Sequence, residues 1–436
     1  MVKSFVNKLT CVLGLLIFFT NTATAKDLLN VFQLAHTNDP ILQAAKKSQL
    51  AKLESLPQAR ALFFPTLNTL ATHTAFDTNA TGTRPHYNQS TYNLAINQPV
   101  FYYQQWVGLS QAKEQVKAAN ADYAAAEQDL IVRVTQSYFN VLRAFDALKF
   151  AKAQRTAVSK FLEQTQQRYK VGLIAITDVQ IAQAQHDNAY AQEITAENNL
   201  ANKEEMLREI TGEPIETYSF LRKELSLKPP EPLNTEEWVN KALAQNLSLQ
   251  AKEFSVKATR ANIRMVESGH LPTLSVTSKI TRMNSEPLNP GSRNSNVGLQ
   301  VNMPIFSGGS VQSKTRQAVY TYEASKKEFE TLHRQIESKT RQAYRGVLTQ
   351  ISQATALKQA IVSNQSALDA TEAAFNVGSR TIVDVLNSQT SLIQAQQNYA
   401  NARYDYILQS IQLKQATGTL TPEDIYYINA WLTQEK

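Results

Sequence analysis

Tyr169-Lys170-Val171-Gly172 and Phe375-Asn376-Val377-Gly378 are equivalent stretches of this sequence, separated by 375 − 169 = 206 residues. The same offset relates Asp178-Val179 to Asp384-Val385, and it holds without a gap over the neighbouring residues. A fixed offset between two halves of a chain is the signature of an internal repeat. The chain is therefore predicted to contain two tandem copies of one structural unit.

Long segments that are poor in glycine and proline flank both stretches. They run over about 103–171 and 173–211 in the first unit, and over about 309–377 and 379–417 in the second. They are rich in Ala, Gln, Glu and Lys, which favour helices. At about 1.5 Å per residue the longer ones would exceed about 90 Å, more than a compact domain can hold. Small and apolar residues in steps of three and four over 385–406 predict a coiled coil, and the Val-Gly pairs predict the tips of two helical hairpins.

Each unit is expected to begin with a helix, over about 27–60 and 235–268, followed by a strand hairpin, over about 65–102 and 272–306. In the second hairpin Leu274, Val276 and Ile280 alternate with polar residues, which predicts strands with one apolar face. Gly308-Gly309 follows this hairpin and is interpreted as a strand-to-helix turn rather than a phosphate-binding loop.

The first 25 residues have the features of a secretory signal peptide. Lys3 and Lys8 precede a short apolar run that ends at Phe19, and Ala23-Thr24-Ala25 follows. Cleavage is predicted after Ala25. The single cysteine, Cys11, precedes the apolar run, so the mature protein is expected to carry no lipid anchor and no cysteine.

Composition argues against several classes of function. The net charge of +7 comes from basic residues scattered among acids, whereas a nucleic-acid binder shows clustered basic residues. The six histidines are dispersed without a metal-binding spacing, and no glycine-rich phosphate loop follows a strand. We therefore expect no enzyme, no cofactor, no bound metal and no nucleic acid.

The strands indicate how the chain assembles. No run of about 18 apolar residues follows the leader, so any membrane crossing must use strands. Four strands per chain cannot close a membrane sheet, because closed sheets in membranes need about eight or more. Two copies would give a barrel filled by its own side chains, whereas three copies leave an opening. A homotrimer embedded in outer-membrane lipid is the preferred assembly.

The sequence resembles the TolC family of outer-membrane channels over essentially the whole mature chain. The resemblance rests on the segments 169–179, 304–309, 378–385 and 400–404, with Gly418-Thr419-Leu420. It implies a mainly helical fold with a 12-stranded membrane β-barrel, four strands per chain, continued by a long α-helical barrel. The repeats span 26–212 and 235–418, and an equatorial collar comprises 213–234 and 419–436.

The resemblance also implies a function. The trimer would be the exit duct of a tripartite efflux pump, of a type I secretion system, or of both. It would extend from the outer membrane into the periplasm and open when a periplasmic adaptor and an inner-membrane transporter of the ABC, RND or MFS class dock. The adaptor would dock at the hairpin tips, Val171-Gly172-Leu173 and Val377-Gly378-Ser379. The sequence does not identify the transported substrates.

By the same resemblance the tips carry a gate. Asp178 and Thr177 at one tip would bond Arg380 at the other, and Asp384 would form a ring of three carboxylates. Phe375 stands where the family often has tyrosine, and Asn387 where it often has a second acid, so closure and cation block are expected to be weaker. Without the resemblance, Asp178, Arg380 and Asp384 would be ordinary solvated helix charges.

The alternative from another class is a periplasmic coiled-coil adaptor or scaffold. Such a protein would also have a signal peptide and a helical hairpin, but it would lack the duplication and the four amphipathic strands. Extraction distinguishes the two, because the channel should require detergent and migrate as an SDS-sensitive or heat-sensitive trimer.

Overall fold

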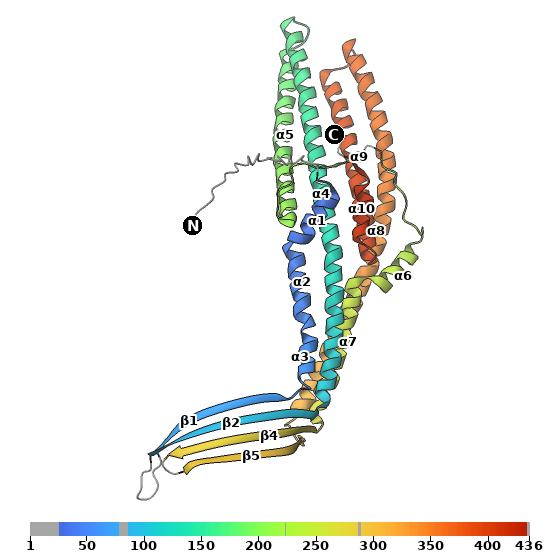
Figure 1. Ribbon diagram of the computed structural model, residues 1–436. Coiled ribbons are helices and arrows are strands. Elements are labelled where there is room, and N and C mark those ends of the chain that lie inside the picture. The colour runs from blue at the N-terminus through green and yellow to red at the C-terminus, as the bar shows by residue number, and fades with distance from the viewer. Residues whose placement is uncertain (1–25, 78–85, 223, 287–288, 434–436) are drawn as a thin grey trace, which may run out of the picture.

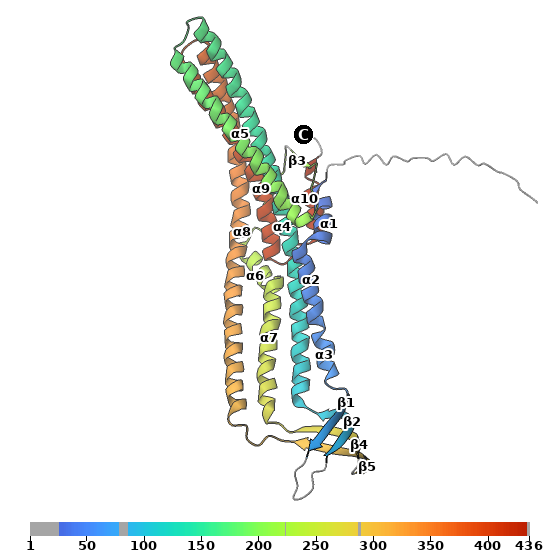
Figure 2. The ribbon, with the colours of Figure 1, turned by 90° about the vertical axis from the view of Figure 1, so that its left-hand side faces the viewer.

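The computed structural model describes residues 26–77, 86–222, 224–286 and 289–433. Long helices run along most of the molecule, a four-stranded sheet projects from one end, and a small mixed region flanks the helices about half-way along (Figures 1 and 2). The fold is elongated, with two helical hairpin tips at the end opposite the sheet (Figure 1).

The sheet joins the strand hairpins of the two repeats. Its strands are β1 (Thr66–Asp77), β2 (His86–Phe101), β4 (Thr273–Glu286) and β5 (Asn289–Asn302), in the order β1-β2-β4-β5. All neighbouring strands are antiparallel, and the β2–β4 pair connects the repeats. Within one chain β1 and β5 are the outer strands, so each leaves one edge without a neighbour.

The two faces of the sheet differ in chemistry. Residues directly opposite each other on antiparallel strands share a face, so the register places one apolar set together, and we call this side the apolar face. Its side chains are exposed or only partly buried: Leu67, Leu94, Ile96, Leu274, Val276, Ile280, Val297, Leu299 and Val301. The other side, the polar face, has mostly Asn, Thr, Ser and Gln. Lys279 is its one charged residue among the described strand positions.

Each repeat contributes one hairpin of long helices. The first is α4 (Tyr103–Lys170) with α5 (Ile176–Thr211), and the second is α8 (Ser310–Asn376) with α9 (Ile382–Ala416). The 68 residues of α4 and the 67 of α8 each correspond to about 100 Å at about 1.5 Å per residue. Among the residues described, no helix has both the length and the apolar character needed to cross a membrane.

The short helices depart from the sequence-based expectation of one helix before each hairpin. The first repeat has α1 (Leu28–Asn38), α2 (Pro40–Leu53) and α3 (Ser55–Ala61). The second has α6 (Thr235–Gln245), α7 (Leu247–Glu267) and a 3₁₀ turn, Ser268–His270. The breaks have local causes: Asp39 and Asn246 are extended residues whose side chains cap α2 and α7. Pro40 at the start of α2 has no N–H to continue α1.

These breaks allow the short helices to meet the ends of the long ones. The Asn38 amide donates to the Thr211 carbonyl at 2.8 Å, and the Asn246 amide donates to the Ala416 carbonyl at 2.9 Å. Gly418 has φ +70°, and a Cβ there would overlap the Gln245 carbonyl. In both repeats, therefore, the break between the short helices meets the end of a long helix. In the second repeat the two segments approach so closely that only glycine fits at position 418.

The largest hydrophobic cluster lies at the mid-height region, where α4 and α9 pack against the collar segments. The collar contains α10 (Pro422–Asn429) and a two-stranded sheet of β3 (Phe220–Leu221) and β6 (Leu432–Thr433). The buried Tyr138 hydroxyl donates to the Ser219 carbonyl at 2.8 Å and accepts from the Ser219 N–H at 3.1 Å. These bonds attach the first collar segment to α4.

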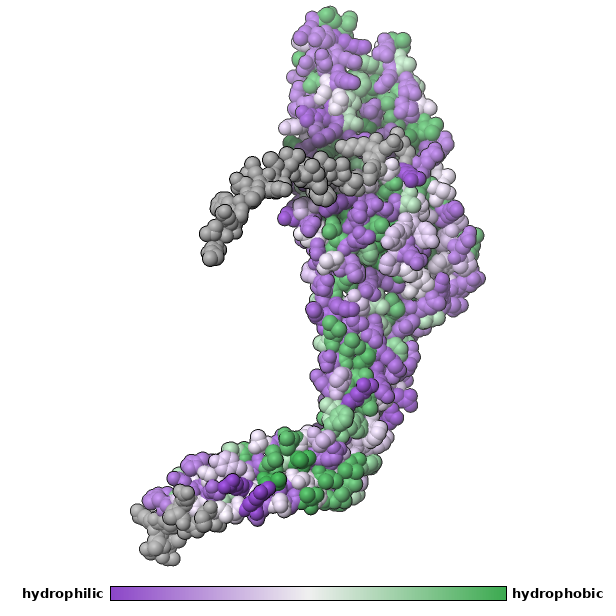
Figure 3. Space-filling view, viewed as in Figure 1, coloured by the Kyte–Doolittle hydropathy of each residue, from purple (hydrophilic) through white to green (hydrophobic). Residues whose placement is uncertain are grey.

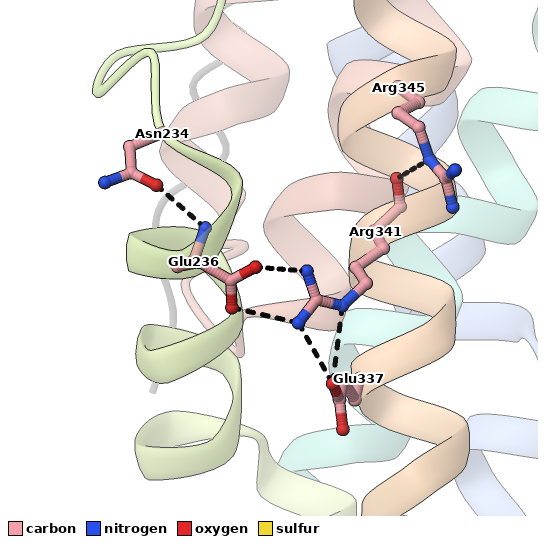
Figure 4. Close-up of polar contacts among 5 residues, drawn as sticks. All are labelled: Asn234, Glu236, Glu337, Arg341 and Arg345. Carbon is pink, nitrogen blue, oxygen red and sulfur yellow. Dashed lines mark hydrogen bonds and ion pairs between the residues drawn. The ribbon is translucent and has the colours of Figure 1, made fainter.

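An ion-pair network ties α6 to α8 at the same height. The Arg341 guanidinium on α8 binds both carboxylate oxygens of Glu236 on α6, one of them at 2.9 Å, and donates to Glu337 at 3.0 Å (Figure 4). The hydrogen bond from Arg341 holds the pKa of Glu236 below its ordinary value. Two-point recognition of a carboxylate by arginine fixes orientation as well as distance, so the network sets the position of α6.

Candidate functional site

The two hairpin tips have the same turn. Gly172 and Gly378 have φ of +77° and +79°, which favours glycine. Leu173 N–H donates to the Arg168 carbonyl at 2.9 Å, and Ser379 N–H donates to the Ala374 carbonyl at 2.9 Å. Each tip thus ends its helix with the left-handed glycine and the six-residue hydrogen bond of a Schellman motif.

The start of α9 packs against the first hairpin. Ile382 and Leu386 form a buried cluster with Val158 of α4 and Ala189 of α5. Phe375, at the end of α8, is partly buried against this cluster, and the Arg168 guanidinium carbon lies 4.4 Å from its ring centroid. The two tips are therefore joined by apolar packing and by a cation–π contact.

Asp384 is held by its own helix terminus. Its carboxylate accepts from the Thr381 N–H at 2.9 Å and from the Thr381 hydroxyl at 2.8 Å, while its N–H donates to the same hydroxyl at 3.3 Å. This reciprocal arrangement is a capping box. The bonds from Thr381, aided by the nearby charge of Arg380, hold the pKa of Asp384 below its ordinary value.

Asp178 occupies the equivalent position in the first repeat but has no such partner. The residue equivalent to Thr381 is Ala175, the N-cap of α5, which makes no side-chain capping bond. Among the described residues of this single chain, no ion pair joins Arg380 to Asp178, and Thr177 and Arg380 are exposed. Asp178 thus lies in the first turn of α5, and its carboxylate can accept hydrogen bonds from groups on other helices or other copies of the chain.

The capping box is a structural feature at a predicted gate residue that the sequence-based prediction missed. Thr381-Ile382-Val383-Asp384 has the Thr-x-x-acid pattern of a helix N-terminus, whereas Ala175-Ile176-Thr177-Asp178 lacks the hydroxyl. That comparison distinguishes a fixed carboxylate in the second repeat from a free one in the first.

The remaining predicted site residues lie as follows. Val171, Leu173, Val377 and Ser379 are exposed at the tips, and Asn387 is exposed on α9. Gly308 and Gly309 have positive φ and precede α8 directly, in the turn after β5. Ala25 lies outside the described residues. No group of three or more His, Cys, Asp or Glu side chains within the described part of the chain is arranged to hold a metal ion.

A family model described as "Outer membrane efflux protein" matches residues 31–213 and again residues 238–419. The chain belongs to this outer membrane efflux protein family. The two matched segments correspond to the two repeats, so the predicted duplication is confirmed, as is the mainly helical fold with a strand portion.

Two relatives illustrate the range of this efflux-protein family. The chain is 37% identical to the outer membrane protein TolC of Vibrio cholerae serotype O1 over 421 residues, covering 94% of this chain and 95% of the relative. It is 26% identical to the alkaline protease secretion protein AprF of Pseudomonas aeruginosa, covering 95% and 89%.

Solved structures show the same fold. The Campylobacter jejuni CmeC outer membrane channel superimposes with a TM-score of 0.81 at 17% identity, covering 93% of this chain and 89% of that one.

Proposed function

We propose that three copies of this chain form the outer-membrane exit duct of an efflux pump, a type I secretion system, or both. The observation that carries the proposal is the exposed sheet, with one apolar face and two edges lacking a neighbour, joined directly to helices of about 100 Å. Family membership supports the same function, because TolC and AprF are named for the outer membrane and for protease secretion.

The sheet edges require other copies of the chain. In lipid, each unpaired backbone N–H or C=O at an edge costs several kcal/mol, so β1 of one copy must pair with β5 of the next. Three copies supply twelve strands, enough to enclose a channel. The apolar faces would then contact lipid, and the polar faces would line the channel. The long helices would continue this channel into the periplasm, after removal of residues 1–25 and without a lipid anchor.

The tips supply a gate in this assembly. Arg380 is exposed, and Asp178 has a carboxylate outside any capping box, so the two can pair when copies or hairpins close together. An exposed pair contributes about 0.2–1 kcal/mol, and three pairs remain weak enough for a docking partner to break. Three copies of Asp384 would form the carboxylate ring. Phe375 contributes packing but no hydroxyl to closure.

The partner that opens the gate would be a periplasmic adaptor working with an inner-membrane transporter. Its docking surface is the exposed apolar side chains at the tips. Val171, Leu173 and Val377 are 70%, 73% and 81% exposed, and they point into solvent where a partner helix could cover them. The class of transporter, whether ABC, RND or MFS, sets the substrate.

A deletion strain tests the proposed function. Loss of the chain is expected to increase susceptibility to toxic compounds, to abolish export of a secreted protein, or to do both. The matched control is complementation with the Val171→Asp, Val377→Asp double variant, which keeps the sheet and collar but removes the apolar tip surface. It should assemble in the outer membrane and fail to restore transport. A strain with unchanged susceptibility and unchanged secretion would contradict the proposal.

A further inference from the structure

Two arginines face each other across β4 and β5 at the far border of the apolar face. Arg282 lies directly opposite Arg293, and Arg282 is also directly opposite Tyr92 on β2. The register therefore places the three side chains in one row on the apolar face. Both arginines are exposed, and Tyr92 is 53% exposed.

This row marks the end of the apolar area. The row before it contains Leu94 and Ile280, and the row after it contains Ser90 and Asn284. From Leu274 to Ile280 the apolar face extends for roughly 20 Å along β4, and Arg282 comes about 7 Å further on. Figure 3 shows hydrophobic side chains over the sheet near the helices and hydrophilic ones towards its far end. In a membrane, Arg282 and Arg293 would lie at the level of the outer headgroups, beside an interfacial tyrosine.

No side chain that the structure describes compensates the charges of this row. Side chains directly opposite on antiparallel strands have Cβ atoms about 4.5–5.5 Å apart, and like charges in that position destabilise the sheet. Among the described side chains, neither guanidinium makes an ion pair or a hydrogen bond. Asp77 near the loop end of β1 is paired with His86 at 3.5 Å. An external anion between the two guanidinium groups would relieve the repulsion.

We propose that Arg282 and Arg293 together bind a phosphate group of lipopolysaccharide in the outer leaflet. Two guanidinium groups can each donate two hydrogen bonds to a phosphate, and the apolar face beside them can contact the acyl chains. Tyr92 and Ser295 place hydroxyls beside the pair that suit a sugar headgroup. The proposal rests on the proposed function, because it requires the apolar face to contact outer-membrane lipid.

Binding of defined lipids to the purified, detergent-solubilised assembly tests this site. The probes are bisphosphorylated lipid A, the same lipid after removal of its phosphates, and inorganic phosphate, with affinities measured by native mass spectrometry. The bisphosphorylated lipid should bind most tightly, and Arg282→Ala with Arg293→Ala should weaken it at least about tenfold. Arg282→Lys with Arg293→Lys keeps the charges and the repulsion but loses two-point recognition, so its affinity should be intermediate.

Lys279→Ala is the matched control, since it removes a positive charge from the same strand but from the opposite face. It should bind lipid A like the parent protein. The proposed site would be overturned if the dephosphorylated lipid or inorganic phosphate bound as tightly as bisphosphorylated lipid A. Unchanged binding of that lipid by the double alanine variant would also overturn it. A protein absent from the outer-membrane fraction would instead overturn the proposed function and the site with it. A protein present there whose arginine variants bind normally would overturn the site alone.

Discussion

The Asp39→Ala variant is expected to lose about 3–5 kcal/mol of unfolding free energy, because it removes the buried partner of Arg133 and the cap of α2. The largely buried guanidinium would keep only the exposed Asp129 as a partner. The Asp39 side chain is 2% exposed and the Arg133 side chain 23%. Arg133 donates to both carboxylate oxygens of Asp39, at 3.0 and 2.8 Å, and Asp39 also accepts from the Leu42 N–H at 2.8 Å as the cap of α2. Urea titration of the detergent-solubilised protein, at equal protein concentrations, measures the loss.

Asp129 supplies a matched control on the same arginine. It accepts from the Arg133 Nε at 2.9 Å, but its side chain is 51% exposed. The Asp129→Ala variant should therefore lose about 1 kcal/mol or less. Equal losses in the two variants would show that burial does not decide the strength of this network.

The Asp39 pair also predicts the direction of a pH effect. Burial opposes ionisation, but the bonds from Arg133 and Leu42 outweigh it and hold the pKa of Asp39 below its ordinary value of 3.8. A group whose pKa is lower in the folded state stabilises the protein above the unfolded pKa and ceases to do so as the pH falls through the folded pKa. The difference in unfolding free energy between the parent and Asp39→Ala should thus have its maximum value at pH 5 and above, and it should decrease only below about pH 4.

The second large effect concerns the gate. Asp384→Asn is expected to abolish block of the channel by divalent cations, because it removes all three carboxylates of the proposed ring. The asparagine side-chain oxygen can still accept from the N–H of Thr381, the N-cap of α9. Asn387→Asp adds three carboxylates one turn further along α9, and it should strengthen the block. Single-channel recording with added divalent cations measures both variants. A block that is unchanged in Asp384→Asn would remove Asp384 from the gate.

The pH dependence of this block tests the capping box. Thr381 holds the pKa of Asp384 low, so the block should persist to about pH 4 and fade only below it. Thr381→Val, which removes the hydroxyl bond, should move the loss of block to higher pH. A block that fades between about pH 5 and 7 in the parent would mean that repulsion among three carboxylates overcomes the bonds from Thr381.

Much of the fold follows from local sequence patterns. The equivalence of Tyr169–Gly172 with Phe375–Gly378 predicted two matching tips, and the structure gives them the same turn and the same hydrogen bonds. The spacings of apolar residues that favour a helix or a strand repeat every few residues, so the sequence alone shows them. The family match then confirmed the duplication.

Features that depend on contacts between distant residues were less accessible. The break at Asp39 has local causes, but its contacts with Arg133 and the contact of Asn38 with the end of α5 involve residues far away in the sequence. Nor could alternation alone predict that Arg282 lies opposite Arg293, because a shift of one residue in register would place them on opposite faces. The predicted Asp178–Arg380 bond involves a contact that one chain does not make, so it stays a proposal for the assembly.

The central claim is that β1 of one copy pairs with β5 of the next and that three copies close the sheet. In a Cys11→Ser background, which removes the only cysteine, Asn68→Cys on β1 can be combined in turn with Asn294→Cys, Asn296→Cys or Gln300→Cys on β5. All four positions lie on the polar face, and a disulfide needs Cα atoms within about 7 Å. Since β1 and β5 are at opposite edges of the four-stranded sheet, any disulfide joins two copies.

Non-reducing gels of the oxidised outer-membrane protein show how many copies the disulfides join. The account predicts that at least one combination yields monomers, dimers and trimers, with the series ending at three. A series that continues beyond three copies, one that ends at two, or the absence of any disulfide in all three combinations would contradict it.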